Sequence, residues 1–397
     1  IPQPVIARTE ELFLDWFASA LAGKDARPIR VIEKFADEMG PRDGACEIIV
    51  SRKKTSPMFA ALINGAASHS VEFDDIHRDS GYHPGSPTIS AALATAQGSG
   101  ATGEQFLRAV IVGYETSTRI GEAVMPSHYN FWHTTGTVGS FGAAASAATA
   151  MRLNHDQFMH AVATVGTFAA GLQQAFLSQA MSKPLHGGHA ADAGVLAAMA
   201  ASKGVTGALD IIEGKKGFAH AMSVNPDFAK VTKDLGRDYH INVMTFKNHG
   251  CCGHPFPSID GVLHLVEQNK LKPADIKQIK LATYKAGLDI IDNATPEGEY
   301  QAKFSLQYTV AHAVVYGSVR LNAFSTERMK DRAVRELMKK IVCVADPVFS
   351  KGYPNQRASQ VDIETVDGRT LSHFQPYRKG DPELPLTDAE LNSKFME

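Results

Sequence analysis

Cysteine is scarce in this chain of 397 residues, which contains four of them. Two of the four, Cys251 and Cys252, are adjacent, and so few thiols in so long a chain do not make a disulfide framework. We therefore expect a reducing compartment, with the cytoplasm as the default. Because the chain begins at Ile1, we expect further residues to precede it, and its opening segment lacks the cationic flank and apolar core of an export signal.

Long apolar runs are also missing. No stretch approaches the roughly 18 consecutive apolar residues that a membrane-spanning helix needs. Charge of one sign is not in excess, since 40 Lys and Arg oppose 42 Asp and Glu for a formal net charge of −2. No long block of like charge could form a nucleic-acid-binding arm. We expect no membrane and no nucleic acid as a partner, and any specificity for an anion must be local.

Helical periodicity dominates the chain up to about residue 245. Apolar side chains share one helical face between Ile6 and Leu21, and Ala-rich stretches with few β-branched residues follow at 58–70, 88–97, 104–121, 139–151, 155–180 and 190–203. Small residues at this density let helices approach closely, which favours a compact bundle with buried central members. Since the chain exceeds the usual size of one core, we predict an all-helical domain over 1–246 and a second domain after it.

The second region, 247–380, mixes both patterns. Residues 276–287 alternate like a strand, and 360–374 predict two strands around an Asp367-Gly368 turn. Helical periodicity over 304–317 and 331–342 separates them, so the region is predicted to be α+β. We expect 381–397 to begin a return to the helical domain that is truncated. The fold class is therefore mainly α, with a large all-helical domain and a smaller α+β domain.

Two motif-like segments are better explained by packing. Gly98, Gly100 and Gly103 match a dinucleotide-binding fingerprint, but an Ala-rich helical stretch precedes them where a strand is required, so we predict a helix-to-helix loop. The His/Cys-rich segment 249–254 has adjacent cysteines that are poorly placed to share one ion, and there is no second CxxC-like pair. We predict no metal site and no iron–sulfur cluster.

Three segments carry candidate chemistry, and the first is residues 69–87, where a helix runs into a polar loop closed by two prolines. Carboxylates beside imidazoles can separate their pKa values, as a proton-transferring site requires. The alternative is a capped helix end with solvated charges. We favour this alternative for Asp75, His77, Arg78 and Asp79, and leave both interpretations open for His83. Glu72 and Asp74 complete the polar cluster.

In the second segment, 130–148, aromatic residues, His133 and small hydroxyl residues such as Thr135 precede a Gly/Ala-rich helix. A helix start offers backbone N–H groups and a positive dipole end, which suit a carboxylate. His133 would then lie beside an anion. The alternative, a histidine packed under Trp132, stays open.

In the third segment, 182–204, Lys183 and His186 lead through Gly187-Gly188 into another Ala-rich helix. Pro184 and the glycine pair favour a tight, backbone-exposed approach to the helix. A lysine there can hold a carboxylate or, with a lowered pKa, exchange protons. The alternative is an ordinary surface lysine.

Taken together, HSVEFDD with HPG, FWHTTGTVGSFGAAA and SKPLHGGHAADAGVLAA resemble, in order and spacing, the signature blocks of the MmgE/PrpD family. That family contains 2-methylcitrate dehydratase, cis-aconitate decarboxylase and iminodisuccinate epimerase. FKNHGCCGHPFPSIDG and FSLQY extend the resemblance over most of the chain. It implies a large helical domain, a smaller α+β lid, assembly as a homodimer and no cofactor.

The resemblance also implies roles for particular residues. The catalytic set is His83, His133, Lys183, Tyr308 and Glu72, and the substrate-binding set is Lys247, Asp74, Thr135 and His186. Glu72 stands where the family usually has aspartate, and one extra residue separates its block from His83 relative to the decarboxylase pattern. We expect a metal-free hydro-lyase acting on a small di- or tricarboxylate, like 2-methylcitrate dehydratase. The alternatives are an epimerase, a decarboxylase, or a carboxylate-binding relative without catalysis.

Overall fold

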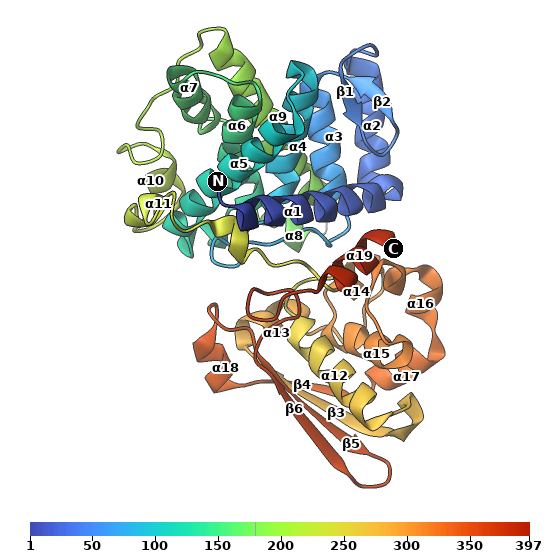
Figure 1. Cartoon of the computed structure of the whole chain (residues 1–397). Helices are drawn as coiled ribbons and strands as arrows, with labels where there is room; N and C mark the ends of the chain where they lie inside the picture. The colour runs from blue at the N-terminus through green and yellow to red at the C-terminus, as the bar shows by residue number, and fades with distance from the viewer. Residues whose placement is uncertain (179) are drawn as a thin grey trace. The chain divides into compact units, whose positions relative to one another are not determined.

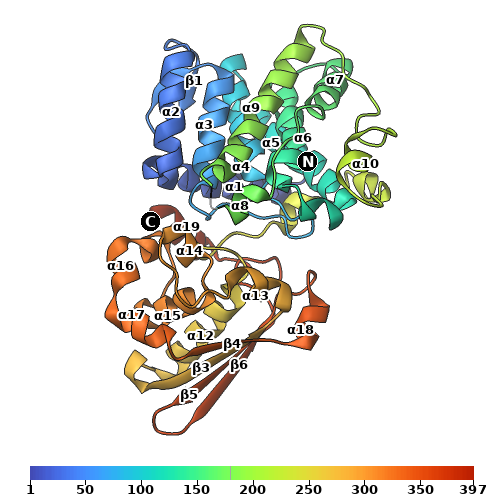
Figure 2. The ribbon, with the colours of Figure 1, turned by 180° about the vertical axis from the view of Figure 1, so that it is seen from behind.

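The chain divides into two compact units in a computed structural model that describes residues 1–178 and 180–397 (Figures 1 and 2). The first, which we call the helical unit, comprises Ile1–Thr245 and Leu391–Met396. The second, the α+β unit, comprises Phe246–Glu390 and Glu397. The fold is mainly α with a smaller α+β region, as the sequence predicts.

The helical unit is a bundle of α-helices with one short hairpin. Its α-helices are α1 (Gln3–Ala22), α2 (Arg27–Met39), α3 (Pro57–His69), α4 (Gly85–Ser99), α5 (Gly103–Val124), α6 (Thr134–Ala150), α7 (His155–Val165), α8 (Gln174–Leu177), α9 (Ser182–Ser202), α10 (Phe218–Met222), α11 (Ala229–Thr232) and α19 (Asp388–Met396). The hairpin is β1 (Cys46–Ile48) with β2 (Lys53–Thr55), and the 3-10 turns are η1 (Gly23–Asp25), η2 (Ser127–Asn130) and η3 (His240–Val243).

Helix α6 lies at the centre of this bundle and packs against α4, α5 and α9 (Figure 1). Nearly all its residues are buried, and they are almost entirely Gly, Ala, Ser and Thr. A Cβ on Gly142 would lie 2.6 Å from Ser117 Oγ of α5, and one on Gly194 of α9 would lie 2.4 Å from the Ala143 Cβ. Small residues are therefore what allow the central helices to approach so closely.

Several predicted helix boundaries are wrong. The helices predicted to start at residues 88, 139 and 190 start at Gly85, Thr134 and Ser182, so the segments before them are helical rather than loops. In α9 the reason is packing, because a Cβ on Gly188 would lie 2.4 Å from the carbonyl oxygen of Leu62 in α3. The stretch 155–180 is not one helix: α7 ends at Val165, and residue 179 lies outside the described residues.

Glycine explains that break. Gly166 caps α7, and Gly171 has φ 146°, a conformation that a side chain would strain. The predicted loop at Gly98–Gly103 is confirmed, since α4 ends at Ser99, Gly100 is left-handed, and α5 begins at Gly103.

The α+β unit contains a four-stranded sheet in the order β4-β3-β5-β6 (Figure 2). Its strands are β3 (Ile276–Thr283), β4 (Ile341–Ala345), β5 (Ser359–Thr365) and β6 (Thr370–Gln375). Its helices are α12 (Phe256–Asn269), α13 (Lys285–Ile291), α14 (Glu299–Lys303), α15 (Leu306–Tyr316), α16 (Thr326–Lys330), α17 (Arg332–Met338) and α18 (Pro347–Gly352), with 3-10 turns η4 (Pro273–Asp275) and η5 (Leu321–Phe324).

Strand pairing in this sheet is parallel between β3 and β4 and antiparallel elsewhere. Helix α12 packs against β5 and β6, and α15 packs against α12 and β4. The β5–β6 hairpin predicted around Asp367-Gly368 is confirmed, and Gly368 supplies the positive φ of 87° that its turn needs. Every second residue of β5 is buried, because one face of the sheet carries the core.

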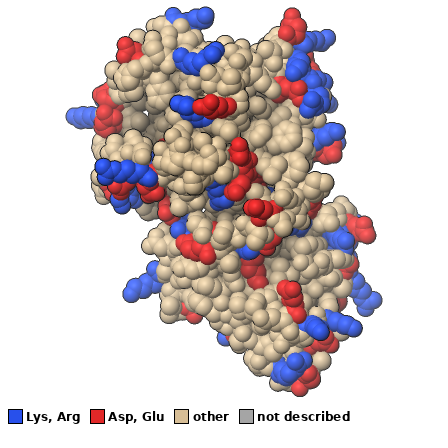
Figure 3. Space-filling model, in the orientation of Figure 1, with Lys and Arg blue, Asp and Glu red and all other residues tan. Residues whose placement is uncertain are grey.

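Among the described residues, no helix has the length and apolar character that crossing a membrane requires. On the face drawn in Figure 3, basic and acidic side chains are interspersed within each unit.

Candidate active site

The loop that follows α3 is folded into the helical unit by backbone hydrogen bonds. The Ile76 N–H donates to the Thr245 carbonyl at 2.9 Å and accepts the Thr245 N–H in return at 2.8 Å, while His77 pairs similarly with Tyr82. The solvated charges predicted for Asp75 and His77 are wrong, because their residues are 3% and 1% exposed. Arg78 is half-buried and Asp79 is exposed, as that interpretation predicts.

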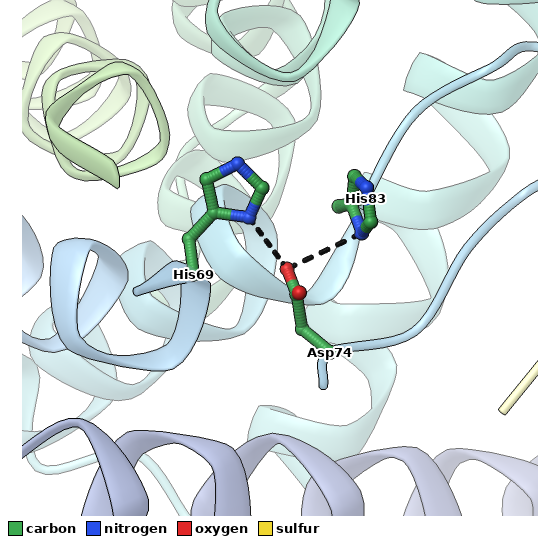
Figure 4. Close-up of side chains that lie close together, drawn as sticks. All are labelled: His69, Asp74 and His83. Carbon is green, nitrogen blue, oxygen red and sulfur yellow. Dashed lines mark hydrogen bonds and ion pairs between the residues drawn. The ribbon is translucent and has the colours of Figure 1, made fainter. Parts of the chain in front are cut away.

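Asp74 lies between two imidazole rings (Figure 4). Its Oδ2 atom is 2.7 Å from Nδ1 of His69 and 3.4 Å from Nδ1 of His83. The backbone N–H of His83 donates to Thr135 Oγ1 at 3.3 Å, which fixes this residue to the start of α6. A carboxylate in this position orients an imidazole and stabilises its protonated form.

His69 is a residue that the sequence prediction missed. It is the last residue of α3 and is 1% exposed. The available signal was its place at the head of the HSVEFDD block, five residues before Asp74. What the sequence could not provide is the chain reversal after α3 that brings the two side chains together.

His133 and His186 form a second imidazole pair. Their Nδ1 atoms are 2.9 Å apart, so one ring must donate a hydrogen to the other. His133 is the N-cap residue of α6 and its ring lies 5.4 Å from that of His69, centroid to centroid. The two histidine pairs are thereby adjacent.

The electrostatic environment keeps this second pair uncharged. Burial, followed by the neighbouring rings of His69, His186 and His83, lowers the pKa of His133 well below its usual value. Burial, followed by the His69 ring and the Lys183 ammonium, lowers the pKa of His186 to about 4. Near neutral pH both rings can donate or accept one hydrogen each without carrying charge.

Lys183 is buried and pairs with Glu72 through its Nζ atom. Both residues are 7% exposed, and Glu72 adopts a left-handed φ of 59°, which is unusual for a residue other than glycine. Lys183 Nζ also lies 5.2 Å from the ring centroid of Phe176, whose edge meets the His133 ring at 4.8 Å. The alternative of a surface lysine is wrong, and Phe176 is a further residue that the sequence prediction missed.

A layer of buried charge supports the loop from below. Tyr114 donates to one oxygen of Asp75 at 2.9 Å and the Gly85 N–H donates to the other at 3.0 Å. Burial, followed by the neighbouring carboxylates of Asp15 and Asp74, nevertheless raises the pKa of Asp75 to about 8.

The C-terminal helix α19 also contacts this layer. Lys394 pairs with the buried carboxylate of Asp15 and donates to the Phe73 carbonyl at 2.7 Å. Residues near the end of the chain therefore hold the backbone between Glu72 and Asp74.

Comparison with known proteins accounts for both units. The model of the MmgE/PrpD N-terminal domain matches residues 1–230, and that of the MmgE/PrpD C-terminal domain matches residues 249–397. The chain belongs to the MmgE/PrpD family.

Relatives within the MmgE/PrpD family have more than one activity in their names. A cis-aconitate decarboxylase-like protein of Aspergillus oryzae is 28% identical over all of this chain and 86% of its own length. The cis-aconitate decarboxylase of Homo sapiens is 24% identical over 98% of this chain and 82% of its length. The 2-methylcitrate dehydratase of Salmonella typhimurium is 29% identical over 29% of this chain and 26% of its length.

Of the nine residues assigned from the MmgE/PrpD resemblance, seven lie in the helical unit and two in the α+β unit. The contacts above bring the seven together: His83, His133, Lys183, Glu72, Asp74, Thr135 and His186. Lys247 is buried at the start of the α+β unit. Tyr308 lies in the core of that unit, where its hydroxyl donates to the Ala323 carbonyl.

The His/Cys-rich segment of the family's C-terminal domain is packed, as predicted. Cys251 is fully buried, and burial raises the pKa of its thiol well above the usual value. His249 contacts Asp260 at 2.9 Å, and His254 contacts the Tyr284 hydroxyl at 2.6 Å. These histidines have protein partners that explain their burial.

Proposed function

We propose that this chain is a hydro-lyase that removes water from a small di- or tricarboxylate. The observation that carries the proposal is the adjacency of two separate histidine pairs, one oriented by the Asp74 carboxylate and one uncharged, next to the buried ammonium of Lys183. Elimination of water needs a base for a carbon-bound proton and an acid for the leaving hydroxide. Two distinct pairs can supply these two roles.

The base belongs to the pair that contacts Asp74. An imidazole hydrogen-bonded to a carboxylate is stabilised when it takes up a proton, and both His69 and His83 approach Asp74 Oδ2. One of them removes the proton from the carbon next to a substrate carboxylate. The electron pair left on carbon forms the new double bond as the carbon–oxygen bond breaks.

The acid belongs to the second pair. A neutral imidazole can donate its ring hydrogen without first gaining a charge, and burial keeps His133 neutral. His133 donates to the departing hydroxide, which leaves as water, and His186 holds the ring through the Nδ1 contact. The net change is the loss of one water molecule from the substrate.

Lys183 holds the substrate carboxylate beside the carbon that loses its proton. An ammonium has three hydrogens, so Lys183 can donate to Glu72 and to a substrate oxygen together. As negative charge develops on the carboxylate, a nearby cation in a buried site stabilises the transition state more than the ground state. Glu72 sets the position of that cation.

Decarboxylation is the second candidate, and the full-length matches to cis-aconitate decarboxylases favour it. Loss of carbon dioxide leaves the same kind of carboxylate-stabilised carbanion, which then needs a single proton donor. The dehydratase match covers 29% of this chain, so sequence similarity gives it less support. The paired histidines are the reason for placing the hydro-lyase first.

A substrate panel tests the proposal. The protein is incubated with citrate, 2-methylcitrate, cis-aconitate and iminodisuccinate, and NMR identifies the products. We expect an unsaturated product formed by loss of water. Release of carbon dioxide would favour the second candidate, and epimerisation, or binding without turnover, would contradict both.

Two variants show whether the site described here is responsible. His133→Asn should abolish most turnover, because it removes the proposed acid. The matched control is His155→Asn, whose side chain is 86% exposed at the surface of the helical unit. The control should retain full activity, and equal activity in the two variants would contradict the assignment.

A further inference from the structure

A second group of histidine and carboxylate side chains lies outside the site described above. His77 comes from the loop after α3, Glu122 from the last turns of α5, and His240 from the start of η3. Glu122 Oε1 is 3.8 Å from His77 Nε2 and 3.4 Å from His240 Nδ1. Three segments that are distant in the sequence therefore direct one oxygen and two nitrogens to a common point.

These separations are those of ligands around one ion. Ligands about 2.0–2.1 Å from a tetrahedral zinc ion lie roughly 3.3–3.4 Å from one another. Two imidazoles bound to such an ion have ring centroids roughly 5 Å apart, and the His77 and His240 rings are 5.3 Å apart and nearly parallel. The distance from His77 to Glu122 is also too long for a direct hydrogen bond.

We propose that His77, Glu122 and His240 bind a divalent transition-metal ion of the zinc class. Two imidazoles and one carboxylate are a ligand set that zinc accepts, with water completing the coordination. His77 is buried, while the side chains of Glu122 and His240 are 21% and 13% exposed, which leaves the carboxylate side open to water.

Neighbouring hydroxyl groups fit the role of outer-shell partners. Ser80 Oγ lies 2.8 Å from His77 Nδ1, and accepting a hydrogen from that nitrogen leaves the Nε2 lone pair directed toward the ion. The Ser80 N–H also approaches Nδ1 at 3.3 Å, so the ion would select one of two tautomers. Thr118 Oγ1 is 3.2 Å from His240 Nδ1 and donates its own hydrogen to the Tyr114 carbonyl.

The nearby positive charge does not compete for Glu122. Arg119 is engaged by Glu115 at 3.1 Å and by the carbonyl oxygens of Lys233 and Asp238. The Glu122 carboxylate therefore remains available to balance part of the charge of a divalent ion.

Such an ion would order the loop that carries the candidate active site. The His77 backbone pairs with Tyr82, and His83 follows directly. Fixing His77 to α5 and η3 would hold both ends of the segment that contains Asp74. No step of the proposed reaction passes through the ion, so this inference is independent of the proposed function.

Metal binding to the whole chain tests the inference. Protein stripped with a chelator is titrated with zinc chloride by calorimetry, and we expect one ion per chain. Glu122→Gln keeps the size of the side chain and removes its charge, and it should weaken binding by at least about 100-fold, more than the loss of an outer-shell partner does. His155→Asn serves as the surface control and should bind as the unmodified protein does.

A third variant separates this group from the other one with suitable spacing. Among the described residues, His69, Asp74 and His83 also have ligand atoms close enough for one ion. His69→Asn leaves that group a single histidine, so zinc-loaded His69→Asn protein should still show two imidazole ligands by X-ray absorption. Failure to bind zinc, loss of binding in His69→Asn, or unchanged binding in Glu122→Gln would overturn the proposal.

Discussion

Replacement of Lys183 by methionine separates the stability of the buried pair from its role in turnover. The change removes the ammonium and leaves Glu72, 7% exposed, without this cation. Breaking a buried ion pair in this way costs about 3–5 kcal/mol in free energy of unfolding. For a unit of this size each kcal/mol lowers the melting temperature by roughly 2–4 °C. We therefore expect the melting temperature to fall by about 10 °C.

The double variant Lys183→Met/Glu72→Gln should regain most of that stability, because no uncompensated charge remains buried. It should not regain activity. If Lys183 stabilises the carbanion-like transition state, kcat falls by roughly 100-fold or more in both variants. Lys183→Arg should not restore it, since a planar guanidinium differs from an ammonium in shape.

Circular dichroism melting and steady-state kinetics measure the two effects. The control is Lys339→Met, which breaks the exposed pair with Glu336 and should change neither quantity appreciably. Normal kcat in Lys183→Met at saturating substrate would refute the catalytic role. Recovery of kcat in the double variant would show that Lys183 acts through folding alone.

Further variants test the layers around this pair. Asp74→Asn should lower kcat by roughly 100-fold or more and change KM little, because it removes the carboxylate that supports the base; normal kcat would exclude this role. The raised pKa of Asp75 stabilises the fold below 3.8, and that contribution is lost as the pH rises through about 8. Asp75→Asn should therefore gain stability relative to the unmodified protein between these values, measured by urea unfolding at several pH values. Lys394→Met should lower both the melting temperature and kcat, since it removes the donor to the Phe73 carbonyl; a change in melting temperature alone would limit Lys394 to stability.

Local sequence signals predicted the fold class because they depend on short-range chemistry. The Ala-rich stretches became packed helices, and Asp367-Gly368 became the turn of a hairpin, because each pattern contains the cause of its own structure. Helix starts were less predictable. Gly187 and Gly188 favour a loop when considered alone, and they are helical because α3 packs against them.

The candidate site was accessible through its motifs but not through its geometry. The three sequence segments contained the correct side chains, yet nothing local indicated that Asp75 and His77 would be buried. The pairing of Ile76 with Thr245 encloses that loop, and its partner lies far along the chain. His69 was missed for the same reason, since its contact with Asp74 depends on the chain reversal after α3.

Exchange of a carbon-bound proton is the measurement that tests the central claim most directly. The substrate identified from the panel is incubated with the protein in D₂O, and deuterium at the carbon next to the carboxylate is followed by NMR. The account predicts that label enters with the unmodified protein and enters at least roughly 100-fold more slowly with Asp74→Asn. Turnover without proton exchange or loss at that carbon, or equal rates in the two proteins, would contradict it.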